Sequence, residues 1–440
     1  MLAPVLDKKH GKGTRAPATR DASERSPQAR LEEAVGLAAA IDLDVKASGL
    51  VPVPDPRPAT LFGSGKVEEL SGLVRAEEAG LVIVDHPLTP VQQRNLETAW
   101  NAKVLDRAGL ILEIFGQRAR TREGRLQVEL AHLTYQKSRL VRSWTHLERQ
   151  RGGFGFLGGP GETQIETDRR IIGESIDVIR KELEQVRRTR ALHRESRQRV
   201  PYPAVALVGY TNAGKSTLFN ALTGASVFAE DTLFATLDPT IRSVRLPGGS
   251  KAVLSDAVGF ISDLPTMLIA AFRATLEEVV EADLILHVRD IADEASVHQR
   301  TDVNAILAEL GVDAEAEPRR LLEVWNKADR LDAAAKRRIE NEAARDPTRP
   351  CLVSAVTGYG LEALLGEIET RLIRTRDTLD LVLQPDEGAL SNWIYENCEV
   401  IDRSDLGDGA THLRIRVAPE KRYRLARLAG ATRLSIAAAE

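Results

Sequence analysis

Apolar positions in the first third of the chain follow two alternating patterns. Short continuous runs typical of buried strands occupy Leu81–Asp85 and Lys103–Asp106, whereas a helical period runs through Ala34–Ile41 and Pro90–Trp100. Strands that alternate with helices in this way predict a small α/β domain, which we place at residues 30–112.

Two segments of this region are interpreted differently. Residues 7–30 are polar, rich in Lys and Arg, and interrupted by Gly and Pro, so we expect residues 1–29 to form a disordered leader. The segment Gly63–Val67 is similar to a phosphate-binding loop, but it lacks the upstream glycine and has Val67 in place of Ser or Thr. We therefore expect a turn followed by a helix there.

Two long helical stripes predict an antiparallel coiled coil at residues 113–200, which we call the arm. The stripes repeat at spacings of four and three residues and comprise Leu126, Leu130, Leu133, Lys137, Leu140, Trp144 and Leu147, then Ile172, Ile176, Ile179, Leu183 and Val186. Thr163–Glu166 has the form of a capping box that would start the second helix. Between the helices, residues 151–161 contain six glycines and predict a tip loop.

The arm is basic in a chain that is acidic as a whole. Residues 115–170 contain eleven Lys and Arg against six Asp and Glu, a net charge of +5, whereas the chain totals −4. The aromatic residues interleaved with these charges are Tyr135, Trp144, Phe154 and Phe156. Cations and stacking rings suit an RNA backbone. The alternatives are a plain glycine-rich connector and arginines that lie individually on a solvated helix face.

The rest of the chain predicts two further domains. Closely spaced prolines, Pro201 and Pro203, mark a boundary, and residues 201–376 again alternate strands with helices, which predicts a mostly parallel sheet with helices on both faces. A small α+β domain at residues 377–440 is predicted from strands at 379–383, 399–403 and 412–417 and helices at 389–395 and 420–428.

A complete G-x-x-x-x-G-K-[ST] loop follows the apolar run Ala204–Val208. With the first residue of the next helix, it comprises Gly209, Tyr210, Thr211, Asn212, Ala213, Gly214, Lys215, Ser216 and Thr217. Glycines let backbone N–H groups point at phosphates, the helix adds its positive end, and Lys215 reaches the β- and γ-oxygens. Ser216 would supply a hydroxyl to Mg²⁺. A chance glycine turn would not also bring the motifs described next, so we predict a nucleoside triphosphate site.

Two later loops indicate that the base is guanine. The N-K-x-D loop, which follows a strand-like run, is Asn326, Lys327, Ala328 and Asp329. The carboxylate of Asp329 would accept both N1–H and the exocyclic amine of guanine, a pair of donors that adenine lacks. Asn326 would tie this loop to the phosphate loop, and Lys327 would lay its alkyl stem over the base. A further guanine loop is expected at Ser354, Ala355 and Val356.

The γ-phosphate and Mg²⁺ would be contacted by two segments between these loops. The first is the D-x-x-G sequence Asp256, Ala257, Val258 and Gly259, in which Asp256 would hold Mg²⁺ through water and the Gly259 N–H would sense the γ-phosphate. The second contains Phe234, Ala235 and Thr236. We choose Thr236 as the second Mg²⁺ hydroxyl, with Thr240 as the alternative. Lys215, Thr236 and Gly259 are the expected catalytic residues.

Phe260 stands where Ras-like proteins have the glutamine that orients the attacking water. A phenyl ring cannot orient water, so intrinsic hydrolysis should be slow and a partner should accelerate it. The alternative, that Phe260 simply packs against the sheet, is compatible with this.

Composition adds limits on location. Cys351 and Cys398 are the only cysteines in the 440 residues, and they form neither a C-x-x-C pair nor a zinc motif. The start of the chain has no apolar run of signal-peptide length, and no apolar run approaches the ~18 residues that suggest a membrane span. A cytoplasmic protein without integral membrane segments is expected.

These motifs closely resemble the HflX-type ribosome-associated GTPases over roughly residues 30–376. The resemblance extends beyond the nucleotide motifs to Asp106–Phe115, Gln127–Ala131, Gly159–Gln164 and Leu233–Thr240. Two positions depart from the family pattern: the arginine before G-P-G-E-T-Q is replaced by Leu157, Gly158 and Gly159 with one extra residue, and D-T-V-G-F has Ala257.

The resemblance implies a GTPase that binds the large ribosomal subunit, places the tip loop near the peptidyl transferase centre, and splits or rescues stalled ribosomes under stress. We expect a monomer that uses GTP and Mg²⁺. Two other classes stay open from the residues alone: a nucleotide-gated RNA-binding module with negligible turnover, and a P-loop enzyme that acts on a small molecule, which the arm and Phe260 disfavour.

Overall fold

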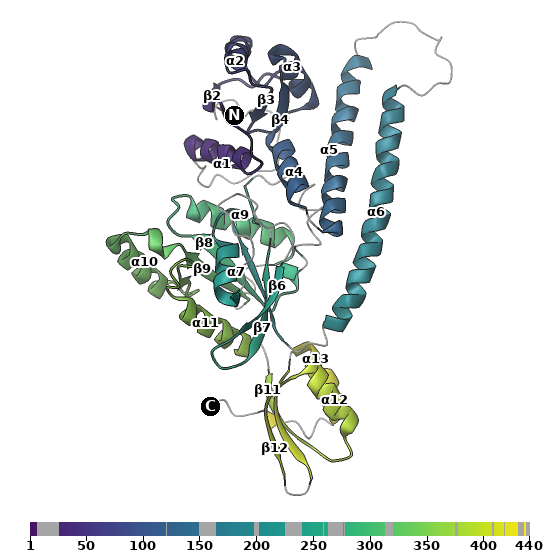
Figure 1. The fold of residues 1–440 in the computed structure, drawn as a ribbon, viewed down its shortest axis with the longest axis vertical. Coiled ribbons are helices and arrows are strands. Elements are labelled where there is room, and N and C mark those ends of the chain that lie inside the picture. The colour runs from purple at the N-terminus through teal and green to yellow at the C-terminus, as the bar shows by residue number, and fades with distance from the viewer. Residues whose placement is uncertain are drawn as a thin grey trace. The chain divides into compact units, whose positions relative to one another are not determined.

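The fold is described from a computed structural model of the chain. The described residues are 1–6, 26–119, 121–148, 164–197, 202–224, 240–257, 259–262, 276, 278–312, 320–374, 377–406, 409–417, 419–429 and 435–436. Their secondary structure alternates strands and helices in the first and third quarters of the chain, as the hydrophobic pattern predicts (Figure 1).

The N-terminal domain is a parallel four-stranded sheet with the order β2-β1-β3-β4. Its strands are β1 (Leu2–Leu6), β2 (Gly49–Val53), β3 (Leu81–Val84) and β4 (Lys103–Asp106), and its helices are α1 (Pro27–Ala39), α2 (Ser64–Ala76), α3 (Pro90–Trp100) and α4 (Arg107–Arg118). Residues of α2 and α3 pack with the sheet in one apolar core that includes Phe62, Leu96 and Trp100. The predicted strands and the helix Pro90–Trp100 are therefore confirmed, whereas the helix predicted at Ala34–Ile41 begins earlier and ends at Ala39.

The expectation of a disordered leader over residues 1–29 is wrong at both ends. Residues Leu2–Leu6 form β1, an interior strand that pairs with β2 and β3, and α1 begins at Pro27 behind the cap Ser26. The apolar residues of β1 bury against partners more than 40 positions away along the chain, in register with Gly49–Val53. Residues 7–25 lie outside the described residues.

The arm consists of α5 (Arg122–Glu148) and α6 (Gln164–Arg197), which run antiparallel (Figure 1). Arg122 contacts Glu182 at 3.3 Å, and Lys137 Nζ lies 3.4 Å from the place of a Cβ on Gly173. The α6 stripe is confirmed, since Ile176, Ile179 and Leu183 are buried. On α5 the most buried apolar residues are instead Val128 and Ala131, because this helix also packs on α3 and α4. No described helix is long and apolar enough to cross a membrane.

The central domain is a six-stranded sheet with the order β10-β9-β8-β5-β7-β6, parallel except for β6. Its strands are β5 (Ala204–Gly209), β6 (Thr240–Arg245), β7 (Lys251–Asp256), β8 (Leu284–Asp290), β9 (Leu321–Asn326) and β10 (Cys351–Leu352). Its helices are α7 (Lys215–Thr223), α9 (Ser296–Glu309), the short 3-10 turn η2 (Ala328–Arg330), α10 (Ala333–Arg345) and α11 (Leu361–Arg374). The carboxyl ends of β5, β7, β9 and β10 carry the described nucleotide motifs, at 209–217, 256–257, 326–329 and 354–356.

The C-terminal domain is an antiparallel sheet with the order β12-β13-β11-β14 and two helices. Its elements are β11 (Asp377–Leu383), α12 (Gly388–Asn397), β12 (Glu399–Asp405), β13 (Thr411–Val417), α13 (Pro419–Ala429) and β14 (Ser435–Ile436). The strands predicted at 399–403 and 412–417 are confirmed as the antiparallel pair β12 and β13. A core of the domain's own includes Leu381, Ile394 and Leu425.

Two compact units cut across the predicted domain boundaries. Among the described residues, the first unit takes those within 1–184 together with 259–262, and the second takes the other described residues from 185 onward. The second arm helix is thus divided after Glu184, and the D-x-x-G loop is divided before Gly259. Contacts in space, rather than the order of motifs along the chain, define these units.

A buried polar layer lies on the face of the central sheet that α9 covers. Glu323 accepts from Arg289 (2.7 Å) and from the indole N–H of Trp325 (3.0 Å), and it pairs with Arg300 of α9 (2.5 Å). Burial alone would raise the pKa of Glu323, but the arginines and the indole outweigh it and the pKa is lowered. The neighbouring His287 is 1% exposed, and burial lowers its pKa to about 3 against the opposing charge of Glu323.

His287 should make the protein less stable in acid. Below its ordinary pKa of 6.5, the imidazole binds a proton in the unfolded chain but stays neutral in the folded one, so its contribution is lost as pH falls. Between pH 7 and pH 5 this linkage amounts to about 2 kcal/mol. We expect His287→Leu to reduce the pH dependence of the free energy of unfolding by that amount, as measured by urea unfolding at both pH values. Equal slopes in the variant and the wild type would contradict this.

Candidate nucleotide-binding site

The loop between β5 and α7 folds tightly enough that two of its positions require glycine. A Cβ on Gly209 would lie 2.2 Å from the carbonyl oxygen of Val288, on the adjacent strand β8. Gly214, with φ of +87°, caps α7, and a Cβ there would lie 2.4 Å from Asn326 Nδ2. Both glycines let the backbone approach neighbouring loops more closely than any side chain permits.

The lysine of the loop is buried and closes the loop on itself. Lys215 Nζ donates to the carbonyl oxygen of Tyr210 at 2.8 Å. Burial lowers the pKa of Lys215 to about 8; the Asp256 carboxylate opposes this shift and Lys327 adds to it. A partly desolvated ammonium inside a ring of backbone amides is suited to phosphate oxygens.

Two of the three predicted Mg²⁺ ligands lie together. The Ser216 hydroxyl donates to Asp256 Oδ2 at 2.7 Å, because β7 pairs with β5 and ends beside the loop. The third, Thr236, lies outside the described residues with Phe234 and Ala235. The alternative, Thr240, begins β6 and pairs in register with Asp256.

The remaining D-x-x-G residues are only partly described. Ala257 is buried, and its N–H donates to the Leu207 carbonyl at 3.3 Å. Val258 lies outside the described residues. Gly259 is buried and belongs to the first compact unit, and Phe260 is 2% exposed.

Asn326 joins its own loop to the phosphate loop, as predicted, and also to the loop at residues 354–356, which was not predicted. Its Nδ2 donates to the carbonyl oxygen of Ala213 at 2.9 Å, and its Oδ1 accepts from the N–H of Ala355 at 3.1 Å. The residue is 1% exposed and ends β9, so its amide cannot turn to water.

Asp329 is held by the second guanine loop. Ser354 donates from its hydroxyl to Asp329 Oδ1 at 2.5 Å, and the Ser354 hydroxyl oxygen accepts from the Thr357 N–H at 3.1 Å. Asp329 itself is exposed, while Ala328 and Ser354 are buried, and Val356 is 77% exposed. The carboxylate is therefore oriented by a hydroxyl yet open to solvent, an arrangement that can receive a base.

One charged residue of this site escaped sequence analysis. Asp290 Oδ2 pairs with Lys327 Nζ at 2.8 Å, and Lys327 has left-handed backbone with φ of +65°. Asp290 is the last residue of the buried strand β8. An acid at the carboxyl end of a buried strand is the sequence signal by which it could have been predicted to lie at the site.

Other phosphate-loop residues have these surroundings. Tyr210, Thr211 and Ala213 are buried, Thr217 is half-buried on α7, and Asn212 has φ of +59°. The structure thus brings together the loops at 209–217, 256–257, 326–329 and 354–356 of the predicted set.

The charge of Arg139 and the ring of Tyr135 suggested an RNA-binding surface, but both side chains bind a carboxylate of the N-terminal domain instead. Arg139 pairs with the buried Asp106, and Tyr135 donates its hydroxyl to the same carboxylate at 2.6 Å. Arg118 donates to the Ala40 carbonyl. These side chains hold the arm and α4 within the N-terminal unit. The side chains of Trp144, Phe154 and Phe156 and the tip loop lie outside the described residues.

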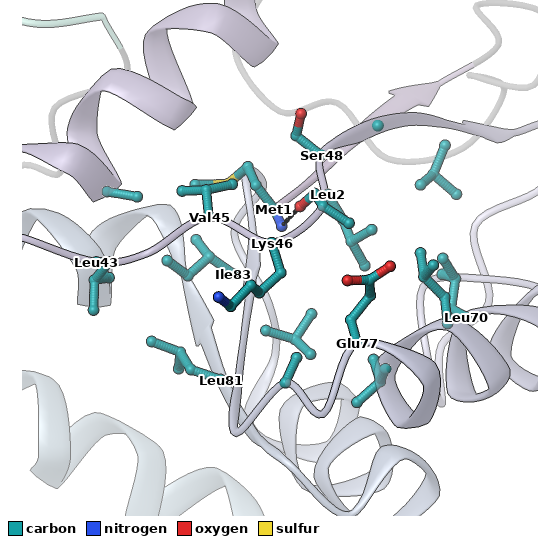
Figure 2. A pocket seen from close by; sticks show the side chains of 18 of the residues that line it. Met1, Leu2, Leu43, Val45, Lys46, Ser48, Leu70, Glu77, Leu81 and Ile83 are labelled. Carbon is teal, nitrogen blue, oxygen red and sulfur yellow. Dashed lines mark hydrogen bonds between the residues drawn. The ribbon is translucent and has the colours of Figure 1, made fainter.

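A separate cavity of about 530 Å³ lies within the N-terminal domain (Figure 2). Aliphatic side chains such as Leu2, Leu70 and Ile83 line it, with Lys46 and Glu77 among them. Lys66, the lysine of the loop-like segment, begins a turn of α2 and bonds Glu69 at 2.6 Å. This confirms a turn followed by a helix instead of a second phosphate loop.

Known protein families match this chain over consecutive segments that cover each of its domains. Four family descriptions match in order: "GTP-binding GTPase N-terminal" at residues 28–116, "GTP-binding GTPase Middle Region" at 118–197, "50S ribosome-binding GTPase" at 204–327, and "HflX C-terminal domain" at 339–437. The fold and its central domain therefore define a P-loop GTPase with extra domains on both sides.

Individual relatives show which family of P-loop GTPases the chain belongs to. GTPase HflX of Magnetococcus marinus is 52% identical over 401 residues, which cover 91% of this chain and 90% of the relative. GTPase HflX of Escherichia coli is 47% identical over 363 residues, which cover 82% and 83%. The chain belongs to the GTPase HflX family and is a GTP-hydrolysing enzyme.

Replacing Gly214 by Ala should weaken nucleotide binding. The new methyl group would collide with the Asn326 amide, and overpacking of this kind costs about 1–3 kcal/mol, or about 5- to 150-fold in affinity. Titration with a fluorescent GDP analogue measures the change.

Gly224→Ala is the matched control for that experiment. Gly224 ends the same helix with φ of +65°, but a Cβ there would meet no atom within 4 Å, so the variant shares the backbone strain without the collision. Equal affinity losses in both variants would show that strain, and not the contact with Asn326, decides binding.

Proposed function

We propose that this GTPase binds the large ribosomal subunit and uses GTP to split or rescue stalled ribosomes. The main support is the match of residues 204–327 to the family described as "50S ribosome-binding GTPase", in a chain that carries the HflX domains on both sides. A long pair of helices attached to an α/β domain suits a factor that reaches into a large RNA assembly.

In this proposal each loop contacts a different part of the nucleotide. Backbone amides of residues 209–216 and the Lys215 ammonium bind the β- and γ-phosphates, and Thr236 and Gly259 contact the γ-phosphate side. Ser216 and Asp256 fit a Mg²⁺ ion, because their hydroxyl and carboxylate oxygens already lie 2.7 Å apart and such oxygens are its preferred ligands. The ion would neutralise charge on the phosphates.

Hydrolysis needs help from the partner. Phe260 is buried and offers no group that holds a water molecule, so the free enzyme lacks this part of the Ras-like machinery. Large subunits would accelerate turnover by ordering the loops or by donating a group. This dependence concentrates GTP turnover on ribosome-bound protein, and the stimulated turnover separates the proposal from a nucleotide-gated RNA-binding module with negligible turnover.

The base assignment predicts a change of nucleotide preference. Asp329→Asn replaces a double acceptor by a group with one donor and one acceptor, so GTP affinity should fall about 100-fold and xanthosine triphosphate should gain relative to it. Competition against a fluorescent GDP analogue measures both.

Asp332→Asn serves as control for that substitution. Asp332 lies three residues further on and only caps α10 through the Ala335 N–H at 2.7 Å, a role that Asn also performs. If wild-type protein bound ATP as tightly as GTP, the assignment of Asp329 would be wrong.

The proposed ribosome binding predicts that GTP turnover and subunit splitting respond differently to loss of the tip loop. Large subunits should raise GTP turnover markedly in the wild type, and deletion of residues 152–159 should impair subunit splitting more than basal turnover, because the tip and the phosphate loop are distinct elements. Turnover and splitting are measured in parallel by phosphate release and light scattering, with Lys215→Ala as the variant that loses both. A wild type without stimulation, or a deletion that splits ribosomes normally, rejects the proposal.

A further inference from the structure

One buried carboxylate of the N-terminal domain binds two side chains of the first arm helix, in addition to the packing of that helix on α3 and α4. Asp106, 2% exposed, caps α4 by accepting from the Gly109 N–H (2.8 Å) and also accepts from the Leu88 N–H (3.3 Å). From α5 it receives the Tyr135 hydroxyl (2.6 Å) and the Arg139 guanidinium (2.5 Å). Charge-assisted bonds of this kind have strict geometry, so Asp106 sets where α5 lies on the domain.

Arg139 strengthens this attachment from the arm side. Its guanidinium stacks on the Tyr135 ring, 4.3 Å from the ring centre, and donates to Gln93 of α3. Burial and the charge of Asp106 both raise the pKa of Tyr135, so its hydroxyl stays a donor at all physiological pH values. The cluster therefore joins α3, α4 and α5.

The next residue, Arg107, faces different partners. Its buried guanidinium pairs with Asp85 (2.6 Å) and Glu33, and it donates to the backbone carbonyl oxygen of Ser262 (3.2 Å). Burial opposes its charge, but the two acids outweigh that effect and raise its pKa. A permanently charged, planar donor can hold two carboxylates and a carbonyl at once, which an ammonium does less well.

Ser262 comes three residues after Gly259, the glycine of the D-x-x-G sequence. Residues 259–262 belong to the same compact unit as the N-terminal domain, whereas Asp256 belongs to the other unit. A loop that shifts with the γ-phosphate must either carry the Arg107 contact with it or break it.

We propose that the consecutive residues Asp106 and Arg107 are positioning residues that couple the D-x-x-G loop to the arm: Arg107 holds the loop at Ser262, and Asp106 holds α5. Both sit at the first turn of α4, so a displacement of this turn is transmitted to both partners. The inference rests on the proposed function for its purpose, but the coupling itself is a property of the isolated protein.

Gly109→Ala tests the coupling with a small wedge. A Cβ there would lie 3.1 Å from Tyr135 Oη and 3.3 Å from both Asp106 Oδ1 and Leu105 Cδ2, so these neighbours must shift without any loss of charge. The matched control is Gly116→Ala on the same helix, where a Cβ would meet only His132 Nε2 at an ordinary 3.8 Å. Tyr135→Phe, which removes a single donor, is the second variant should the wedge unfold the domain.

The readout is a distance between spin labels at Arg75→Cys on α2 and Val178→Cys on α6, both exposed, with GDP and with a GTP analogue. The native thiols label poorly, since Cys398 is buried and burial raises the pKa of Cys351 to about 11. We expect the distance to depend on the nucleotide in the wild type and in Gly116→Ala, and not in Gly109→Ala or Tyr135→Phe. A merely structural role for Asp106 would lower stability in the variants without removing this dependence.

Co-sedimentation with large subunits separates this inference from the proposed function. The ratio of subunit affinities with GTP analogue and with GDP should fall toward one in Gly109→Ala, by about fivefold or more. A wild-type distance that ignores the nucleotide, or a wedge variant that keeps the wild-type dependence, overturns the coupling even where subunit binding is nucleotide-dependent. Loss of subunit binding in every nucleotide state would instead reject the proposed function, and the label distances would still decide the coupling.

Discussion

The side-chain amide of Asn326 is the contact on which the nucleotide site depends. It is buried at the end of β9, donates to Ala213 in the phosphate loop and accepts from Ala355 in the second guanine loop. Three loops that follow three different strands are thereby fixed relative to one another. Gly214 is the other side of this constraint, because only a residue without Cβ leaves room for the amide.

The charged side chains around Asn326 favour the binding of an anion. Lys327 lies close enough to Lys215 to lower the pKa of Lys215 further, beyond the effect of burial. Each lysine has an acid nearby: Asp256 for Lys215 and Asp290 for Lys327. The Lys215 ammonium is satisfied by the Tyr210 carbonyl, a bond that phosphate oxygens are able to replace. The site is thus organised for a charged ligand by buried groups that already have partners, so little rearrangement is needed on binding.

Four arginines described in the N-terminal domain and the arm serve two different purposes. Arg107 is buried and Arg139 is half-buried, and both bind carboxylates of the N-terminal domain, whereas Arg122 and Arg170 lie exposed and pair with acids of the arm. A net charge counted along the sequence adds both kinds together. Arg139 is one of the eleven Lys and Arg counted between residues 115 and 170, and its pairing with Asp106 makes the charge that this segment offers to solvent smaller than +5 suggests.

The sequence by itself determined the features that depend on neighbours a few residues apart. The glycine spacing of residues 209–216, the buried runs of β3, β5 and β9, and the helix of Pro90–Trp100 with its Thr89 cap are all local patterns, and the structure contains each of them. Tertiary structure alone decided the pairing of β1 inside the sheet and the binding of Arg139 and Tyr135 to Asp106. It also decided the place of Asp290 beside Lys327 and the division of the D-x-x-G loop between two units. Each of these depends on partners tens of residues away, and periodicity carries no information about which distant strand or carboxylate a side chain will meet.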